Sequence, residues 1–455
     1  MNTYENIDRQ LNVIKYNAGI LAKGVKKVLR LELPESFLET IYIPFIGFIL
    51  KFNLIDCNTR LGVDFIENFD ELTLLVRGKE CLGNPDILLY NIEVDTNSYD
   101  FISHARINIY EKIIFKIYGI SHSELKNIKP DKAINYCHDI ESRVRLRKYI
   151  KSFDVDFPDL INLIPLTLFE GLKEKKIDNN IIPPKCHWLG QIYNENYIFY
   201  LATLKEKKTI IIGQPHGGTY CQIQHMTASE AAERLLTDIY HIPSWDFRVK
   251  SFPNWRASRN RFLQLKNIVR KKNNKEKMLV VLSYFYIDNE PRAIDNITGD
   301  LFANDFYISQ LKTLKSHFSE SFDFKLYPRQ NSDVLPKLEF LKQLFPDCEF
   351  IMVGSVLDNA RHYEGVIHMD SYGTAVIELS TTRIPQYVYL GPEVMLNSEY
   401  ELFLWDSKKA STRKDYSSGS YILIDNRKYR NAYGASFFYP FYFASLINRI
   451  KKNSI

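Results

Sequence analysis

The strongest constraint on the fold is a segment in which β-branched residues run directly into a proline, a histidine and two glycines, Thr209-Ile-Ile-Ile-Gly-Gln-Pro-His-Gly-Gly-Thr-Tyr220. An apolar run bounded by glycine and proline is typical of a parallel strand that is covered on both faces. Gly217 and Gly218 let the backbone turn sharply and approach a ligand closely. Residues 227–237 are strong helix formers. Strand, loop and helix in this order form the phosphate-binding sites of α/β proteins.

Length and composition indicate a globular protein with room for more than one domain. The chain has 455 residues, of which 45% are hydrophobic and 25% are charged. These values allow two or three domains with ordinary cores. The net charge of +5 is spread along the chain, which argues against a dedicated nucleic-acid-binding protein, because such proteins concentrate basic residues in a stripe or tail. Weak attraction to anionic lipid or to a phosphorylated substrate stays open.

Cysteine spacing and the chain start favour the cytoplasm. The six cysteines contain no CxxC pair, so neither a zinc ribbon nor a disulfide framework is indicated. The polar, charged beginning does not read as a signal peptide. Residues 37–50 are the most hydrophobic stretch, but they are too short and too interrupted to span a bilayer. We expect a buried helix or strand pair there, with a membrane-surface or partner contact as the alternative.

The second half of the chain has a regular α/β pattern after a basic segment at 265–277, which we interpret as a solvated linker or helix end. Strands that alternate with helices indicate βαβ units and a parallel sheet. We therefore predict a Rossmann-type domain at 278–395. Its expected strands are 278–284, 322–327, 349–353, 365–369 and 385–390, and its expected helices are 304–318, 334–345 and 373–382.

The remaining residues predict a first domain and an extension. Residues 1–265 read as an α/β domain with an elaborated N-terminus, whose strand pattern becomes clear only near 188–218. Residues 396–455 read as a C-terminal extension, in which a final helix could cross back onto the first domain. The expected fold class is therefore α/β, with two facing Rossmann-type domains.

Ligands of open α/β sheets bind beyond the carboxyl ends of strands, and one such end carries small polar residues. Asp370, Ser371, Gly373 and Thr374 precede an apolar helical stretch. Backbone N–H groups, the helix dipole and the hydroxyls could hold a monophosphate or diphosphate there. Glu378 lies one turn after Thr374 and could accept hydrogen bonds from a ribose diol. Alternatively, Ser371 only caps the helix and Glu378 faces solvent.

Two further strand ends carry candidate substrate contacts. Arg329 follows Pro328 and could make a forked contact to phosphate, with a surface salt bridge as the alternative. Gln214, Gly217 and Gly218 lie in the loop after the first strand described above, where the glycines leave space for a substrate.

His216 is the candidate general base, because it stands between Pro215 and Gly217 and because imidazole titrates near neutral pH. A structural histidine is the alternative. Glu230 and Glu233 follow on the expected helix, and either could orient His216 or act as the base. For both glutamates the pattern favours a solvent-exposed helix charge.

No metal cofactor is expected. His225 lies nine residues after His216, outside a short zinc pattern, and Asp154 with Asp156 lacks a third ligand. We interpret six other histidines as packing or surface residues: His104, His122, His138, His187, His317 and His362.

Several of these motifs resemble a bacterial transferase family encoded among surface-carbohydrate genes, of the GT-B glycosyltransferase type. The similarity lies in the 214–218 loop, the helix with Glu230 and Glu233, and the segment 237–245. The strand end at 325–329 is similar to the Lys-x-His-Pro strand end of bacterial sialyl-, Kdo- and polyol-phosphate transferases, and 370–374 looks like their helix start. Tyr327 stands where those enzymes carry the histidine that contacts the donor phosphate, so the likeness does not extend to a cytidine-nucleotide donor.

The resemblance implies a GT-B-like, metal-independent glycosyltransferase with a nucleotide-sugar as co-substrate and no cofactor. The donor would bind mainly in the C-terminal domain. The acceptor, a cell-surface glycan or a lipid-linked molecule, would bind mainly in the N-terminal domain. A cytoplasmic enzyme follows, with peripheral contact to the inner membrane left open. The alternatives are a CDP-activated polyol-phosphate transferase and a catalytically silent GT-B-like scaffold.

Overall fold

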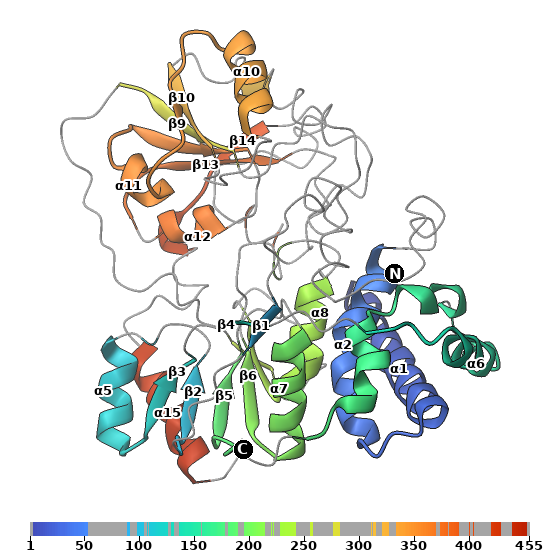
Figure 1. Ribbon diagram of the computed structural model, residues 1–455. Coiled ribbons are helices and arrows are strands. Elements are labelled where there is room, and N and C mark those ends of the chain that lie inside the picture. The colour runs from blue at the N-terminus through green and yellow to red at the C-terminus, as the bar shows by residue number, and fades with distance from the viewer. Residues whose placement is uncertain are drawn as a thin grey trace.

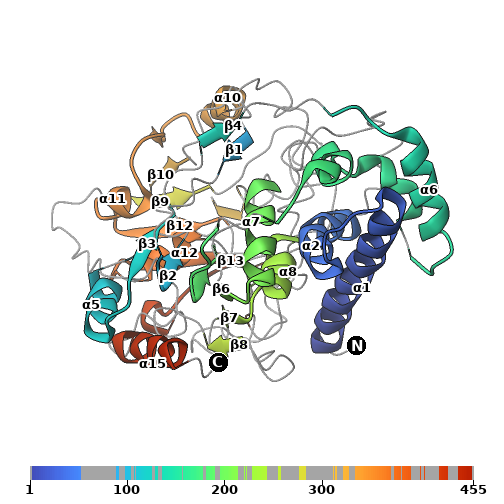
Figure 2. The same ribbon diagram turned by 60° about the horizontal axis from the view of Figure 1, so that its bottom comes forward.

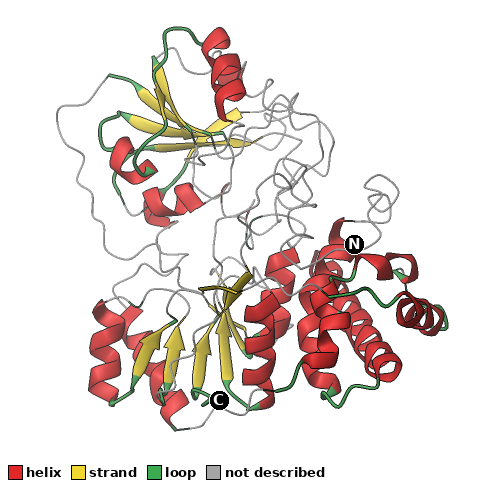
Figure 3. Ribbon diagram, in the orientation of Figure 1, coloured by secondary structure: helices red, strands yellow, loops and turns green. Residues whose placement is uncertain are grey.

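The computed structural model has two lobes, each built on its own six-stranded sheet (Figure 1). Figure 3 separates these sheets from the helices around them. The predicted domain boundaries near residues 265–278 and 395 fall largely in segments outside the described residues. The structure describes residues 3–52, 89–91, 98–103, 107, 109–125, 129–131, 136–155, 157–177, 181–189, 195–213, 220, 222, 228–242, 255–257, 276–282, 311, 313–314, 321–326, 334–369, 374–380, 382–390, 400, 404, 420–428 and 439–452.

The N-terminus forms a helical layer on the first lobe. Helix α1 (Thr3–Leu29) packs along α2 (Glu35–Phe52), and α2 also packs against α7 (Glu195–Glu206) and α8 (Ala228–Leu236). Because α2 has apolar residues all around its axis, it is stable only where it is covered on several sides. The prediction that residues 37–50 are buried is confirmed, and they form one helix.

The first sheet has the order β3-β2-β5-β6-β7-β8, and every neighbouring pair in it is parallel. The predicted strand at 209–213 is present as its central strand β6. A separate antiparallel pair joins β1 (Leu89–Asn91) to β4 (Lys129–Asp131). The strands of the sheet are β2 (Phe101–Ser103), β3 (His122–Glu124), β5 (Cys186–Trp188), β6 (Ile210–Gly213), β7 (Ile239–Ile242) and β8 (Trp255–Ala257).

Successive residues of these strands enter two different cores. Ile211 belongs to the core formed with α2, α7 and α8, whereas Ile212 belongs to the core on the opposite face. His187 points to the α7 face, where its Nε2 lies 2.9 Å from the Tyr197 hydroxyl. Both faces of β6 are therefore buried, as the unbroken apolar run predicts.

Helix α15 (Tyr439–Lys451) returns from the end of the chain to cover the second face of the first sheet, beside α5 (Ile109–Tyr118). Phe443 lies 5.5 Å from Phe115 and 5.9 Å from Trp188, measured between ring centroids. The prediction that the final helix crosses back onto the first domain is confirmed (Figures 1 and 2).

The second sheet has the order β11-β10-β9-β12-β13-β14 and is parallel except for β14, which pairs antiparallel with β13. The five predicted strands are present in shortened form. Strand β14 lies within the predicted C-terminal extension and was not anticipated. The strands are β9 (Met278–Val281), β10 (Phe322–Lys325), β11 (Phe350–Ile351), β12 (Gly365–His368), β13 (Gln386–Leu390) and β14 (Ser420–Leu423).

Helices cover both faces of the second sheet. Val280, Phe324 and Ile367 share a core with Leu341 of α10 (Val334–Leu344). The other face packs on α11 (Val356–Ala360) and α12 (Thr374–Leu379). Two mostly parallel sheets with helices on both faces confirm the expected α/β class and the pair of Rossmann-type domains.

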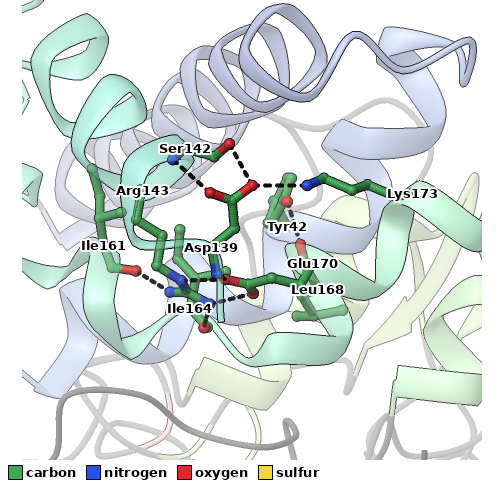
Figure 4. A network of polar contacts seen from close by, with 9 residues as sticks. All are labelled: Tyr42, Asp139, Ser142, Arg143, Ile161, Ile164, Leu168, Glu170 and Lys173. Carbon is green, nitrogen blue, oxygen red and sulfur yellow. Dashed lines mark hydrogen bonds and ion pairs between the residues drawn. The ribbon is translucent and has the colours of Figure 1, made fainter. Parts of the chain in front are cut away.

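A buried ion pair fixes helix α6 (Ile140–Ile150) to the segment that follows it (Figure 4). The Arg143 guanidinium donates from Nε and Nη2 to the two carboxylate oxygens of Glu170, at 2.8 and 2.7 Å. Nη1 and Nη2 also donate to the carbonyl oxygens of Ile161 and Ile164, respectively. Arg143 is only 2% exposed, so this basic helix, which also carries Arg145, Arg147 and Lys148, turns one of its arginines inward.

The start of α6 is tied to the same network. Asp139 caps the helix, because its carboxylate accepts from the Ser142 backbone N–H at 2.9 Å. The ammonium group of Lys173, 2.8 Å away, is the main reason why the pKa of Asp139 lies well below its usual range. Tyr42 of α2 donates to the carbonyl oxygen of Leu168, and this bond connects the network to the N-terminal helices.

Replacing Arg143 with leucine is expected to destabilise the protein by about 3–5 kcal/mol, because the Glu170 carboxylate would stay buried without its counter-ion. Arg145→Leu on the same helix is the control. Arg145 pairs with Glu141 at the surface, at 3.9 Å, and its loss should cost less than about 1 kcal/mol. Denaturant midpoints measure both variants, and equal losses would contradict the role of the buried pair.

Candidate functional site

The second sheet reverses its order of strand addition between β9 and β12. The chain adds β10 and β11 on one side of β9 and then places β12, β13 and β14 on the other side. Ligands of open α/β sheets bind outside the carboxyl ends of the strands at such a reversal. Residues 370–373 follow β12 directly in the sequence. The predicted phosphate site therefore begins at the reversal point of this sheet.

The first sheet has its own reversal, between β2 and β5. The loop that contains His216 follows β6, which is the neighbour of β5. His104 follows β2 directly in the sequence, so strand order makes it a candidate that its local sequence did not indicate. A reversal depends on strand order, and no local pattern carries that information.

Only four of the predicted site residues are described. Glu230 and Glu233 lie on α8 in the first lobe, and Thr374 and Glu378 lie on α12 in the second lobe (Figure 1). The others lie outside the described residues: Gln214, His216, Gly217, Gly218, Arg329, Asp370, Ser371 and Gly373.

Described residues bracket the His216 loop on both sides. At its start, a Cβ on Gly213 would come within 2.7 Å of Thr237 Cγ2 and 2.8 Å of Tyr240 Cδ2. Glycine is required here because the helix end and strand β7 approach the backbone closely. At its far side, the Tyr220 hydroxyl donates to Glu233 at 3.0 Å.

Glu230 and Glu233 are buried, with 1% and 0% exposure, so the expectation that both are exposed helix charges is wrong. Glu230 forms a buried ion pair with Arg234, one turn further along α8. Glu233 accepts from Tyr220 and, at 3.4 Å, from Tyr240. The reason is tertiary: α8 packs against α2 and against strand β6, and Tyr220 and Tyr240 of β7 lie against the Glu233 carboxylate.

The surroundings of Glu233 keep it in the role of an acceptor. Burial, followed by the charge of Glu233, raises the pKa of Tyr240 well above its usual range. The hydroxyl therefore stays protonated and donates. The Arg234 guanidinium lies 5.2 Å from the centre of the Tyr240 ring, within cation–π range. This buried cluster holds Tyr220, which follows the His216 loop in the sequence, against α8.

In the second lobe, β12 ends in a buried histidine. His368 is 3% exposed, and its Nε2 lies 2.7 Å from Gln386 Oε1. Gln386 donates to Asn426, which donates to the carbonyl oxygen of Ile384 at 2.6 Å. Burial lowers the pKa of His368 to about 4. A neutral imidazole supports the strand end but supplies no positive charge to a phosphate.

Strand β10 ends in a buried lysine. Lys325 is 1% exposed and donates to the carbonyl oxygen of Ile351 at 3.4 Å. Burial lowers its pKa. Register places Lys325 beside Val281 of β9 and Val281 beside His368 of β12. The two basic side chains therefore belong to the same face at the carboxyl ends of these strands, separated by one strand.

The helix after β12 is shorter than predicted. It spans Thr374–Leu379, six residues, instead of 373–382, and Thr382 instead bonds back to the carbonyl oxygen of Leu379 at 2.7 Å. A short helix contributes less dipole than the predicted one. Glu378 is half-buried and has an interaction partner, so it is not a freely solvated charge.

Within the described ranges, no group of three or more His, Cys, Asp or Glu side chains could hold a metal ion. None of the described helices combines the length and the apolar character needed to cross a bilayer.

Comparisons with known proteins give no sequence family. No family model and no curated protein matches the chain. Among solved structures, it is similar to a Listeria monocytogenes protein assigned as a UDP-N-acetylglucosamine 2-epimerase, at 11% identity and a TM-score of 0.36, over 78% of this chain and 97% of that chain.

Two further structures are similar. One is S. aureus MnaA in complex with UDP, at 10% identity, 77% and 88% coverage and a TM-score of 0.32. The other is the UDP-GlcNAc 2-epimerase of Neisseria meningitidis bound to UDP-GlcNAc, at 12% identity, 76% and 87% coverage and a TM-score of 0.32. These likenesses are too distant to support an activity, and the fold follows from the sheets themselves.

The neutral state of His368 predicts a stability that depends on pH. Its pKa is 6.5 in the unfolded chain and about 4 in the fold, so the unfolded state binds more protons between these values. The contribution of the neutral His368 to the free energy of unfolding is fully present above pH 6.5. It decreases by up to about 3 kcal/mol as the pH falls to about 4. In His368→Gln the loss between neutral pH and pH 4 should be smaller by a similar amount. His362 is exposed, so His362→Gln is the control and should lose as much stability between neutral pH and pH 4 as the wild type does. An equal loss in His368→Gln would contradict a neutral, buried His368.

Proposed function

We propose that this chain is a GT-B-type glycosyltransferase, which moves a sugar from a nucleotide-activated donor to a cell-surface glycan or a lipid-linked acceptor. The observation that supports this most is the presence of two Rossmann-type sheets, each with a glycine-containing segment directly after a central strand. These segments are 214–219 after β6 and 370–373 after β12. Two such strand ends suit a reaction with two substrates.

In this proposal the donor binds beyond β12, at the reversal point of the second sheet. Arg329 contacts a phosphate, Ser371 and Thr374 donate from their hydroxyls, and Glu378 accepts from the ribose. Because α12 is short, the guanidinium and the hydroxyls have a larger share in binding than the helix dipole. The neutral His368 and the buried Lys325 lie on the strands below this site.

Chemistry is assigned to the loop after β6. His216 removes the proton from the acceptor hydroxyl, whose oxygen forms a bond to the anomeric carbon of the donor sugar. The bond from that carbon to the phosphate oxygen breaks, and its electrons leave with the nucleotide. Gln214, Gly217 and Gly218 contact the substrates. Glu233 acts through Tyr220 by holding the end of this loop. Its burial among tyrosines makes it a positioning residue in this proposal.

The test is nucleotide binding by thermal shift with CMP, CDP, UDP, GDP and dTDP. A nucleotide at a hundred times its dissociation constant should stabilise the protein by about 2.7 kcal/mol, so the correct base should stand out. CDP as the best ligand, with polyol-phosphate transfer, would favour the alternative transferase. Absence of binding by all five would contradict a nucleotide-dependent enzyme and favour the scaffold.

The same titration in variants locates the donor site. Arg329→Ala should weaken binding by about 1.5–3 kcal/mol, the contribution of a charge-assisted hydrogen bond, and Glu378→Ala should also weaken it. Arg383→Ala is the control, since Arg383 is exposed in the same lobe. Unchanged affinity in both site variants would place the donor elsewhere.

His216→Ala should lower turnover by about a hundred- to ten-thousand-fold while the melting temperature stays close to that of the wild type, because a positioned base contributes to the rate and not to the fold. The assay contains EDTA. Because the proposed mechanism uses no metal, the wild type should keep its turnover under this condition. Tyr220→Phe, which removes only the hydrogen bond to Glu233, should cause a smaller loss. A folded His216→Ala variant with near-normal turnover would remove His216 from the mechanism.

A further inference from the structure

Helix α5 carries a row of exposed isoleucines on the side that faces away from the protein. Ile109, Ile113 and Ile117 are 64%, 49% and 72% exposed. They are spaced four residues apart, so they lie above one another on one face of the helix. Ile114 and Phe115 fill the core from the opposite face. In the part of the chain that the structure describes, α5 therefore contributes to the core from its other face, and the exposed row is not part of that core.

Lysines alternate with the isoleucines on this face. Lys112 and Lys116 are both exposed, and Glu111, the only acidic residue of the helix, is buried. We call Ile109, Lys112, Ile113, Lys116 and Ile117 the α5 surface. The charged residues of the α5 surface are both lysines. One carboxylate lies beside them, that of Glu124 on β3, at 3.9 Å from the Lys112 ammonium group.

The C-terminal helix extends the positive charge. Lys451 Nζ donates to the carbonyl oxygen of Tyr118 at the end of α5, at 2.8 Å, and both Lys451 and Lys452 are exposed. Two lysines therefore lie on α5, Lys451 contacts its end, and Lys452 follows Lys451 in the sequence. Figures 1 and 2 show α5 and α15 together at one side of the first lobe, away from α1 and α6.

We propose that the α5 surface docks the protein on an anionic lipid membrane. Isoleucines can enter the boundary between headgroups and acyl chains, while the lysine stems lie along them and the ammonium groups reach the lipid phosphates. Positive charge next to an apolar row matches an anionic headgroup layer. A second copy of the chain fits less well, since two identical surfaces would bring lysines against lysines. The inference is independent of the proposed transferase activity.

The test uses the full-length protein and vesicle co-sedimentation. Wild-type protein should bind vesicles of phosphatidylcholine mixed with phosphatidylglycerol, and bind pure phosphatidylcholine at least about tenfold more weakly. Two variants should each lose binding to the mixed vesicles at least about tenfold: the triple Ile109→Ser/Ile113→Ser/Ile117→Ser, and the double Lys112→Glu/Lys116→Glu. Higher salt should weaken wild-type binding.

A matched control comes from α6, where Ile140 and Val144 are exposed to a similar extent, 58% and 60%. Ile140→Ser/Val144→Ser should bind mixed vesicles as the wild type does. Melting temperatures are compared for all variants, so that loss of fold is distinguished from loss of docking. Equal binding to both vesicle types, no binding by the wild type, or full binding by the triple isoleucine variant would overturn the proposal. So would a wild-type dimer in solution that the isoleucine variant converts to monomer.

Discussion

The first lobe depends on burying both faces of its parallel sheet. Ile211 and Ile212 point to opposite sides of β6 and belong to different cores, so neither face can be left to water without losing apolar burial. The chain meets this requirement with its two ends. The N-terminal helices pack behind α7 and α8, and α15 returns to the other face, where Phe443 contacts Phe115 and Trp188.

The same packing also buries charged residues. Since Glu230 and Glu233 are buried, they need partners inside the protein, which Arg234, Tyr220 and Tyr240 supply. Arg143 and Glu170 do the same at the edge of the N-terminal layer. A buried charge that loses its partner strongly destabilises the folded state. These pairs therefore restrict how the helices can dock, and the cluster on α8 also holds Tyr220, which follows the proposed catalytic loop in the sequence.

Local patterns were sufficient for much of the second lobe. Its five parallel strands appear in the sequence as short apolar runs between turn residues, because strands that are buried on both faces need apolar residues throughout. Strand β14 was missed, since it is an antiparallel edge strand whose pairing with β13 depends on a segment thirty residues away in the chain. Burial of Glu230 was missed for a similar reason. Its spacing from Arg234 is visible in the sequence, but the same i,i+4 spacing also fits an exposed helix pair.

Sequence patterns alone were enough to predict the α/β class, the strand and helix that flank residues 214–219, the burial of residues 37–50 and the presence of a final helix. All of these depend on hydrophobic periodicity, which is a local property. The packing of distant segments was needed to show that the glutamates of α8 are buried, that His368 is neutral, and that the sheets reverse beside β2 and β9. Burial and strand order are set by segments far apart in the chain. The tertiary structure also left the isoleucines of α5 exposed, because the opposite face of that helix already completes the core.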